Sequence, residues 1–190
     1  MPYSQALQDD LRHPPIGAPV GGFLQRFQPP LLRLLASIDR AVRTADPRID
    51  RTVASILSGY VGEADLLAGI ACPSSDERYA RHLLHAGQGY SVLAVVWRPG
   101  QMSSVHGHQT WCALGVHRGS LTESLFGHDK KTLRLIGCKQ HHLGAISHSS
   151  ANGEAIHRIA NLGTETAVSI HAYGVAFDRL GEGVNRVWAD

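Results

Sequence analysis

The chain has 190 residues, of which 43% are hydrophobic and 18% are charged, and its formal net charge is +2. This composition is that of an ordinary globular protein, long enough to build one core, and it excludes the disordered and fibrous classes. Lysine and arginine are scattered along the chain, so the clustered basic surface of a nucleic-acid-binding protein is not expected.

The N-terminal segment gives no sign of membrane insertion or export. Residues 1–25 contain acids and prolines where a signal peptide has an apolar run, and no stretch of the chain reaches the roughly 20 apolar residues that span a bilayer. The cysteines Cys72, Cys112 and Cys138 are few and far apart, which favours reduced thiols over a disulfide scaffold. We therefore expect a cytoplasmic protein.

Two helical stretches are predicted next. Apolar residues recur at helical spacing over residues 30–46, directly after Pro29, and proline favours the first turn of a helix. Apolar residues recur at a similar spacing over residues 50–70, and Gly59 and Gly62 interrupt the pattern. Both stretches are expected to be amphipathic helices.

From residue 77 onward the sequence changes to short segments rich in β-branched and aromatic residues, separated by turn signals. Strands are expected near residues 78–85, 90–98, 103–107, 110–117, 120–126, 132–137, 143–147, 155–161 and 167–173. Many short strands at regular spacing indicate a sandwich or barrel. The predicted fold is mainly β: a cupin, or double-stranded β-helix, formed by residues 77–190, with residues 1–76 supplying helices that pack on it within one structural domain.

A candidate metal site begins with His106 and His108, which lie two residues apart in a predicted strand. Alternate residues of a strand point to the same face, so both imidazoles can reach one ion. Two histidines on a polar strand face would show the same spacing, so a third ligand is required. His157, in a later predicted strand, is the candidate. Three histidines bind zinc or iron according to geometry and availability, and a substrate thiolate can supply an anionic ligand to iron(II).

A polar series follows in the last predicted strand. Ser169, His171 and Tyr173 alternate with apolar residues and therefore share one face. Facing inward, they can form a relay in which the serine orients the imidazole toward the tyrosine hydroxyl; an outward polar face is the alternative. The remaining histidines, including the adjacent pair His141 and His142, are interpreted as surface or structural residues.

Three further residues are candidates for the same site. Tyr79 and Arg81 share a strand face, and an inward arginine is costly unless it meets an anion such as a substrate carboxylate. Pairing of Arg81 with solvent or a surface acid is the alternative. Cys112 has the same strand parity as His108, so it either faces the site or is a small buried hydrophobe.

Taken in order, these motifs resemble the cysteine dioxygenase family over about residues 77–178. The matching elements are Tyr79-Ala-Arg81 followed by Leu83-Leu84, the strand VLAVVW, His106-x-His108, His157-Arg158 with Asn161, and Ser169-x-His171-x-Tyr173. The resemblance implies a cupin that holds iron(II) with three histidines and adds both atoms of dioxygen to a thiol sulfur, giving a sulfinate. It implies His106, His108 and His157 as iron ligands, Ser169, His171 and Tyr173 as an outer-sphere relay, and Arg81 with Tyr79 as the substrate-binding residues.

The sequence departs from the family pattern at a few positions. Gly107 lies where the family usually has aspartate, which removes no ligand. The segment TWCALGVHRG is closer to bacterial 3-mercaptopropionate dioxygenases, which usually have glutamine at the position of Arg81 and glycine at that of Cys112. Both residues resemble the cysteine-specific type, in which a cysteine near the iron can form a thioether with the relay tyrosine, here Cys112 with Tyr173.

The sequence therefore predicts an iron(II) thiol dioxygenase whose substrates are dioxygen and a small carboxylated thiol. L-Cysteine is the expected thiol, and 3-mercaptopropionate or another mercapto acid is the alternative. A zinc hydrolase or lyase with three histidine ligands and a non-enzymatic, ligand-sensing cupin are alternatives of other classes. No nucleic acid or membrane is expected as a partner, and the sequence leaves the oligomeric state open.

Overall fold

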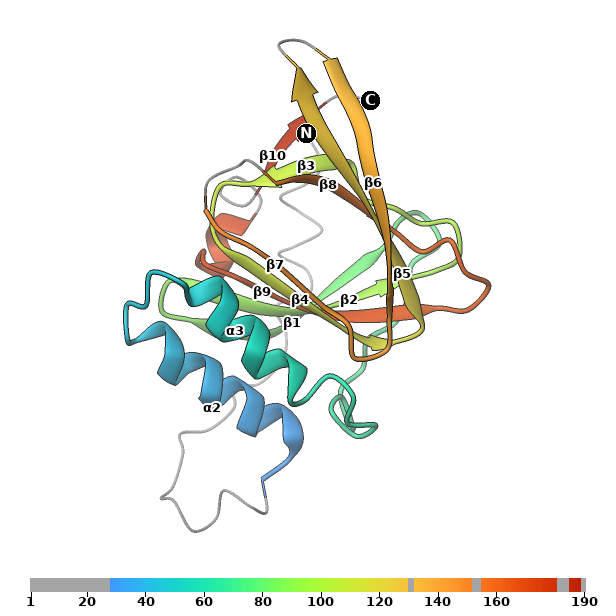
Figure 1. The fold of residues 1–190 in the computed structure, drawn as a ribbon. Helices are drawn as coiled ribbons and strands as arrows, with labels where there is room; N and C mark the ends of the chain where they lie inside the picture. Colours follow the sequence, from blue (N-terminus) through green and yellow to red (C-terminus); the bar gives the residue numbers. More distant parts are fainter. Residues whose placement is uncertain (1–27, 130–131, 152–154, 181–184, 189–190) are drawn as a thin grey trace.

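The structure, a computed structural model, describes residues 28–129, 132–151, 155–180 and 185–188 (Figure 1). The described helices are α2 (Pro30–Val42), α3 (Ile49–Ser58) and a short 3-10 turn at Phe177–Arg179. The strands are β1 (Ala80–Gly87), β2 (Tyr90–Trp97), β3 (Val105–His108), β4 (Cys112–Arg118), β5 (Ser120–Asp129), β6 (Thr132–His142), β7 (Ile146–Ser149), β8 (Ile156–Ala160), β9 (Ala167–Tyr173) and β10 (Asn185–Trp188). None of the described helices has the length and apolar character needed to cross a membrane.

The first predicted helix is confirmed, although α2 ends at Val42 rather than at residue 46. Proline occupies its first turn, where a missing backbone N–H costs no hydrogen bond. The residues that give the helical period form its buried face: Leu31, Leu34, Leu35, Ile38 and Ala41.

The second predicted helix, over residues 50–70, is wrong in its second half. Helix α3 ends at Ser58, with Gly59 as its C-cap, and the chain then continues through successive turns closed by short-range backbone hydrogen bonds. Glycine costs roughly 1 kcal/mol relative to alanine inside a helix, which favours the stop. Val61 and Leu66 are nevertheless buried, so the apolar rhythm after Gly59 marks packing against the sheet and not a helix.

The strands form two five-stranded antiparallel sheets that face each other, which confirms the predicted mainly β, cupin-type architecture (Figure 1). The first sheet has the order β1-β2-β9-β4-β7 and the second β10-β3-β8-β5-β6. Helices α2 and α3 cover the outer face of the first sheet. Contact is close there: a Cβ atom on Gly115 of β4 would lie 2.6 Å from Cγ1 of Val61.

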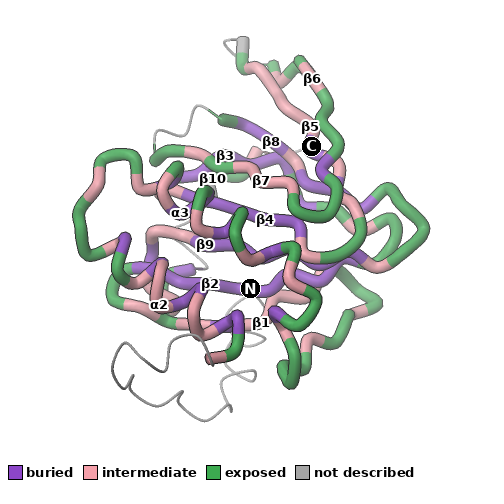
Figure 2. The backbone as a smooth tube through the Cα atoms, turned by 60° about the horizontal axis from the view of Figure 1, so that its bottom comes forward, coloured by how far each residue is buried: buried purple, intermediate pink, exposed green. Residues whose placement is uncertain are grey.

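Because side chains alternate along each strand, the two faces of the first sheet pack into two different hydrophobic cores, one under the helices and one between the sheets. On β2, Val92 and Ala94 pack with the helices, whereas Leu93, Val95 and Trp97 join the cluster between the sheets. Strands β2 and β9 are therefore covered on both faces, and Figure 2 shows them buried through the middle of the molecule. Because the helices take one face of β9, its other face is left to the space between the sheets, where a site can form.

Two features of the second sheet differ from the prediction. Strand β10 was not predicted, because its four residues are too short to show a period; it is defined by its pairing with β3, in which Val187 lies opposite His106. Strand β6 extends to His142 instead of residue 137, because its polar second half stays paired with β5. That extension brings His141 into the sheet.

Candidate metal centre

The three histidines proposed as ligands meet between the sheets. His106 and His108 project from the same face of β3, and His157 of β8 is the direct cross-strand partner of His106. The Nε2 atom of His157 lies 3.0 Å from that of His108 and 3.2 Å from that of His106. Their side chains are almost fully enclosed, since His106, His108 and His157 are 7%, 2% and 6% exposed. The described residues thus contain a buried group of three histidines that can hold a metal ion.

Hydrogen bonds at the far side of two rings fix which nitrogen faces the centre. Nδ1 of His106 donates to the backbone carbonyl of Ser104 at 2.9 Å, and Nδ1 of His157 donates to the carboxylate of Glu123 at 2.6 Å. Burial lowers the pKa of His106 to about 4, so this imidazole is neutral at physiological pH. When both imidazoles are neutral in these tautomers, the Nε2 atoms of His106 and His157 present lone pairs to each other, which a cation between them would accept. The donor set therefore fits a metal ion.

A second buried network lies behind His157. The other oxygen of Glu123 accepts a hydrogen bond from Nε2 of His141 at 2.8 Å, and the hydroxyl of Ser147 donates to the same carboxylate at 3.3 Å. Burial alone would raise the pKa of Glu123, but the imidazole donors of His141 and His157 hold it well below its usual value. Neither Glu123 nor His141 was expected here. One signal was available: Glu123 shares strand parity with Leu121, so an acid lies on an apolar face.

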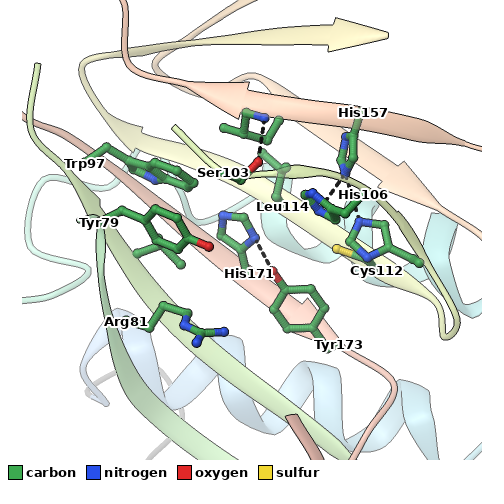
Figure 3. A pocket seen from close by; sticks show the side chains of 13 residues that line it. Tyr79, Arg81, Trp97, Ser103, His106, Cys112, Leu114, His157, His171 and Tyr173 are labelled. Atoms are coloured by element: carbon green, nitrogen blue, oxygen red, sulfur yellow. Dashed lines mark hydrogen bonds between the residues drawn. The ribbon is translucent and has the colours of Figure 1, made fainter. Parts of the chain in front are cut away.

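The predicted relay is assembled on the inner face of β9. Ser169 Oγ lies 2.8 Å from Nε2 of His171. Nδ1 of His171 lies 2.9 Å from the hydroxyl of Tyr173 (Figure 3). Burial lowers the pKa of His171 to about 3 and raises that of Tyr173 well above its usual value, so both groups are uncharged at neutral pH. Strand alternation predicted that these three side chains share one face, and the structure shows that this face is the inner one.

Trp97, at the end of β2, adds a hydrogen-bond donor to the relay, and the sequence did not reveal this contact. Its indole Nε1 lies 2.9 Å from Ser169 Oγ, and an indole can only donate. Ser169 accepts that bond, which leaves its own proton available for Nε2 of His171. In that arrangement the neutral imidazole carries its proton on Nδ1 and donates it to the Tyr173 oxygen, and the Tyr173 hydroxyl proton points into the cavity.

The three histidines of the metal-binding group line one cavity of about 30 Å³ between the sheets, together with Trp97, His171 and Tyr173. Arg81, Tyr79 and Cys112 also line it, whereas Ser169 is not part of the lining and joins the site through its hydrogen bond to His171. Tyr79 stacks on Trp97 with ring centroids 4.4 Å apart, and Arg81 extends toward the side where Tyr173 lies (Figure 3). Among the residues that the structure describes, no carboxylate forms an ion pair with Arg81, and no acidic side chain lines the cavity.

Cys112 is placed by the register of the first sheet. It is the direct cross-strand partner of Tyr173 in the β4–β9 pair, and both side chains line the cavity. Cys112 is a free thiol, and burial raises its pKa well above the usual value. The loop before it is fixed to the end of β9, because the Thr110 hydroxyl donates to the carbonyl of Gly174 at 2.6 Å.

Comparison with known proteins agrees with this site. The family model of cysteine dioxygenase type I matches residues 30–182. The chain belongs to that family. The match extends across both helices and strands β1 to β9, so it covers every residue of the site. As a family member with a buried three-histidine group, the protein has the fold and the metal-binding residues of a cupin-type, metal-dependent thiol dioxygenase.

Several solved structures are similar to the chain at low identity. A protein from Thermus thermophilus matches with 14% identity, 55% of this chain and 90% of that chain covered, and a TM-score of 0.46. A cupin-superfamily sugar phosphate isomerase from Silicibacter pomeroyi gives 17% identity, 54% and 66% coverage, and a TM-score of 0.43. An uncharacterized conserved protein with a double-stranded β-helix domain from Klebsiella pneumoniae gives 15% identity, 62% and 90% coverage, and 0.44.

Proposed function

We propose that the protein is an iron(II) thiol dioxygenase that converts L-cysteine and dioxygen to cysteine sulfinate. The observation that carries the proposal is the convergence, on one small cavity, of three metal-binding imidazoles, an uncharged tyrosine hydroxyl and an arginine that has no ion-pair partner among the described residues. Both atoms of dioxygen enter the product, so the thiol RSH and one O2 become RSO2H.

In this proposal His106, His108 and His157 hold the iron through their Nε2 atoms. When bound, iron(II) supplies the redox chemistry by which dioxygen, otherwise slow to react with a closed-shell thiol, oxidises the sulfur. The two sheets enclose the reacting sulfur in a cavity of about 30 Å³, which favours a small thiol over a large one. Tyr173 donates its hydroxyl proton into that cavity, held there by His171, Ser169 and Trp97.

Arg81 is proposed to bind the substrate carboxylate. Arg81 is half-buried, lines the cavity and has no ion-pair partner among the described residues, and a carboxylate accepts two parallel hydrogen bonds from a guanidinium. A specific observation also favours 3-mercaptopropionate as an alternative substrate: no acidic side chain among the cavity residues is available to pair with the ammonium group of cysteine. Both thiols present the carboxylate that Arg81 would bind.

The proposal is tested by loading the protein with iron(II) under anaerobic conditions and then measuring oxygen uptake with cysteine, 3-mercaptopropionate and cysteamine. We expect one O2 consumed per carboxylated thiol and a sulfinate product identified by mass spectrometry, with no uptake by the zinc-loaded protein. Stoichiometric zinc that supports hydrolysis would instead support the zinc enzyme. Full iron occupancy without thiol-dependent oxygen uptake would support the ligand-sensing cupin.

Replacing Arg81 by glutamine is expected to weaken the binding of every carboxylated thiol. Loss of a bidentate, charge-assisted contact should cost about 1.5 to 3 kcal/mol, or about tenfold to a hundredfold in apparent affinity. Cysteamine, which lacks the carboxylate, should be a poor substrate of the parent and change little in the variant. The measurement is the steady-state kinetics of each thiol. The control is Arg118→Gln, which removes the same charge from an exposed position on β4. An unchanged specificity constant in Arg81→Gln would remove this residue from substrate binding.

A thioether between Cys112 and Tyr173 is also proposed, and the cross-strand register of the two residues supports it. Formation joins the sulfur to a ring carbon, breaks one S–H and one C–H bond, and passes two electrons and two protons to dioxygen, which becomes hydrogen peroxide. We expect intact-mass spectrometry after aerobic turnover to show the loss of two hydrogens, and peptide mapping to join the two segments. Exposed Cys138 should stay unlinked. Recovery of only separate Cys112 and Tyr173 peptides from active protein would contradict the link.

A further inference from the structure

A buried chain of hydrogen bonds runs from the metal-binding group away from the cavity. It connects His157 of β8, Glu123 of β5 and His141 of β6, with distances of 2.6 Å and 2.8 Å from the imidazole nitrogens to the two carboxylate oxygens. Glu123 and His141 are 5% and 1% exposed, and neither lines the cavity. These two residues are therefore removed from the thiol and from dioxygen, and can act on the reaction only through His157.

The sheet register explains how three separate strands supply this chain. On β5, Leu121 lies opposite His141 and Leu125 lies opposite His157, so Glu123 is the diagonal same-face neighbour of both histidines. Diagonal neighbours on one face are within reach of long side chains. The backbone ladders already join β5 to β6 and to β8, so the three polar side chains are not needed to hold these strands together.

Their burial is costly, which calls for a compensating role. A carboxylate and an imidazole taken out of water lose hydration that apolar side chains at the same positions would not lose. The carboxylate can only accept hydrogen bonds, so Nδ1 of His157 must carry a proton. In the neutral imidazole, the form that binds a metal ion, Nε2 is then left with the lone pair. His106 reaches the same tautomer through the uncharged backbone carbonyl of Ser104. His157 differs in having a charged partner, which makes an imidazole a stronger ligand.

We propose that Glu123 and His141 are positioning residues of the metal centre: Glu123 fixes the tautomer and orientation of His157, and His141 fixes Glu123. This inference rests on the proposed three-histidine metal site and not on the identity of the thiol. His141 donates to one carboxylate oxygen and leaves the other to face His157, with Ser147 as an additional donor. A change at His141 should therefore reach the metal only when Glu123 is present.

The test is the metal affinity of the protein, measured by anaerobic competition between the full chain and a chelator for iron(II) and for zinc(II). Glu123→Gln keeps the size of the side chain but removes its charge and one acceptor, and should raise the dissociation constant about tenfold to a hundredfold. His141→Phe should raise it by a smaller factor. The double variant should match Glu123→Gln alone, because His141 acts through Glu123. His142→Phe, the same change on the exposed neighbour, should leave the affinity unchanged.

Two measurements separate this role from a merely structural one. Nitrogen-15 NMR of the metal-free protein should show His157 protonated on Nδ1 in the parent and in a mixture of tautomers in Glu123→Gln. Thermal unfolding of the metal-free proteins should show whether the variants are folded. If Glu123→Gln does not fold, the metal affinity of His141→Phe is the test of the inference. Unchanged affinities in folded variants, or losses that add in the double variant, would overturn the inference. A parent that binds no metal would instead overturn the proposed function.

Discussion

Alanine in place of His106, His108 or His157 is expected to abolish tight metal binding and, with it, thiol-dependent oxygen uptake. Each substitution leaves only two of the three imidazoles whose ligand nitrogens lie within 4.8 Å of one another. Two imidazoles cannot hold a labile divalent ion against dialysis as three do. The loss should be near complete and similar at all three positions, because none of the remaining cavity residues is a carboxylate that could substitute as a ligand.

The fold should survive these substitutions. The histidine side chains point into the cavity, whereas β3 and β8 are held by backbone pairing with each other and with β10 and β5. Metal content after anaerobic dialysis, circular dichroism and oxygen uptake are the measurements, with His142→Ala as the exposed histidine control. A variant at any of the three positions that kept full metal occupancy and normal turnover would show that the ligand set is wrong.

Replacing Tyr173 by phenylalanine is expected to give the second largest effect, a loss of turnover of about a hundredfold or more with the metal content unchanged. The variant keeps the ring but loses the hydroxyl that His171 orients and that donates into the cavity. Burial keeps this hydroxyl protonated, since it raises the pKa of Tyr173 well above its usual value. Removing it therefore removes a proton donor, while the three histidines are left in place.

Tyr173→Phe also prevents a link to Cys112, so the loss of the hydroxyl must be distinguished from the loss of the thioether. Cys112→Ser is the matched variant, since it removes the link and keeps the hydroxyl. We expect Cys112→Ser to lose much less turnover than Tyr173→Phe, because the link would restrict the phenol ring without supplying the proton. Single-turnover oxygen uptake at known iron content is the measurement. Equal turnover in Tyr173→Phe and the parent would eliminate the relay.

Much of this site was predictable because short-range rules govern strands. Alternation in β3 and β9 puts His106 with His108, and Ser169 with His171 and Tyr173, on single faces whatever the tertiary structure. β-Branched and aromatic residues between turn signals predict that β2 and β9 are strands. Helix α2 was predicted because its apolar period is strict and a proline begins it.

Other features depend on contacts that no local pattern encodes. The register of β4 against β9 places Cys112 opposite Tyr173, and that of β3 against β8 places His106 opposite His157. Register is set by the pairing of whole strands, so the parity of Cys112 alone could not identify its partner. The end of α3 at Ser58 and the pairing of β10 likewise depend on packing against the sheets, because glycine-rich or very short segments have weak preferences of their own.

The mainly β class and the sets of histidine, serine and tyrosine side chains that share a face follow from local sequence, because side-chain direction in a strand depends on the backbone alone. The groups that lie behind these side chains depend on how the two sheets are assembled. Trp97, Glu123 and His141 come from strands β2, β5 and β6, and they act on Ser169 and His157 through hydrogen bonds between strands. Such bonds exist only once the sheets are assembled and water is excluded, so three polar residues that are ordinary in the sequence become the surroundings of the metal centre.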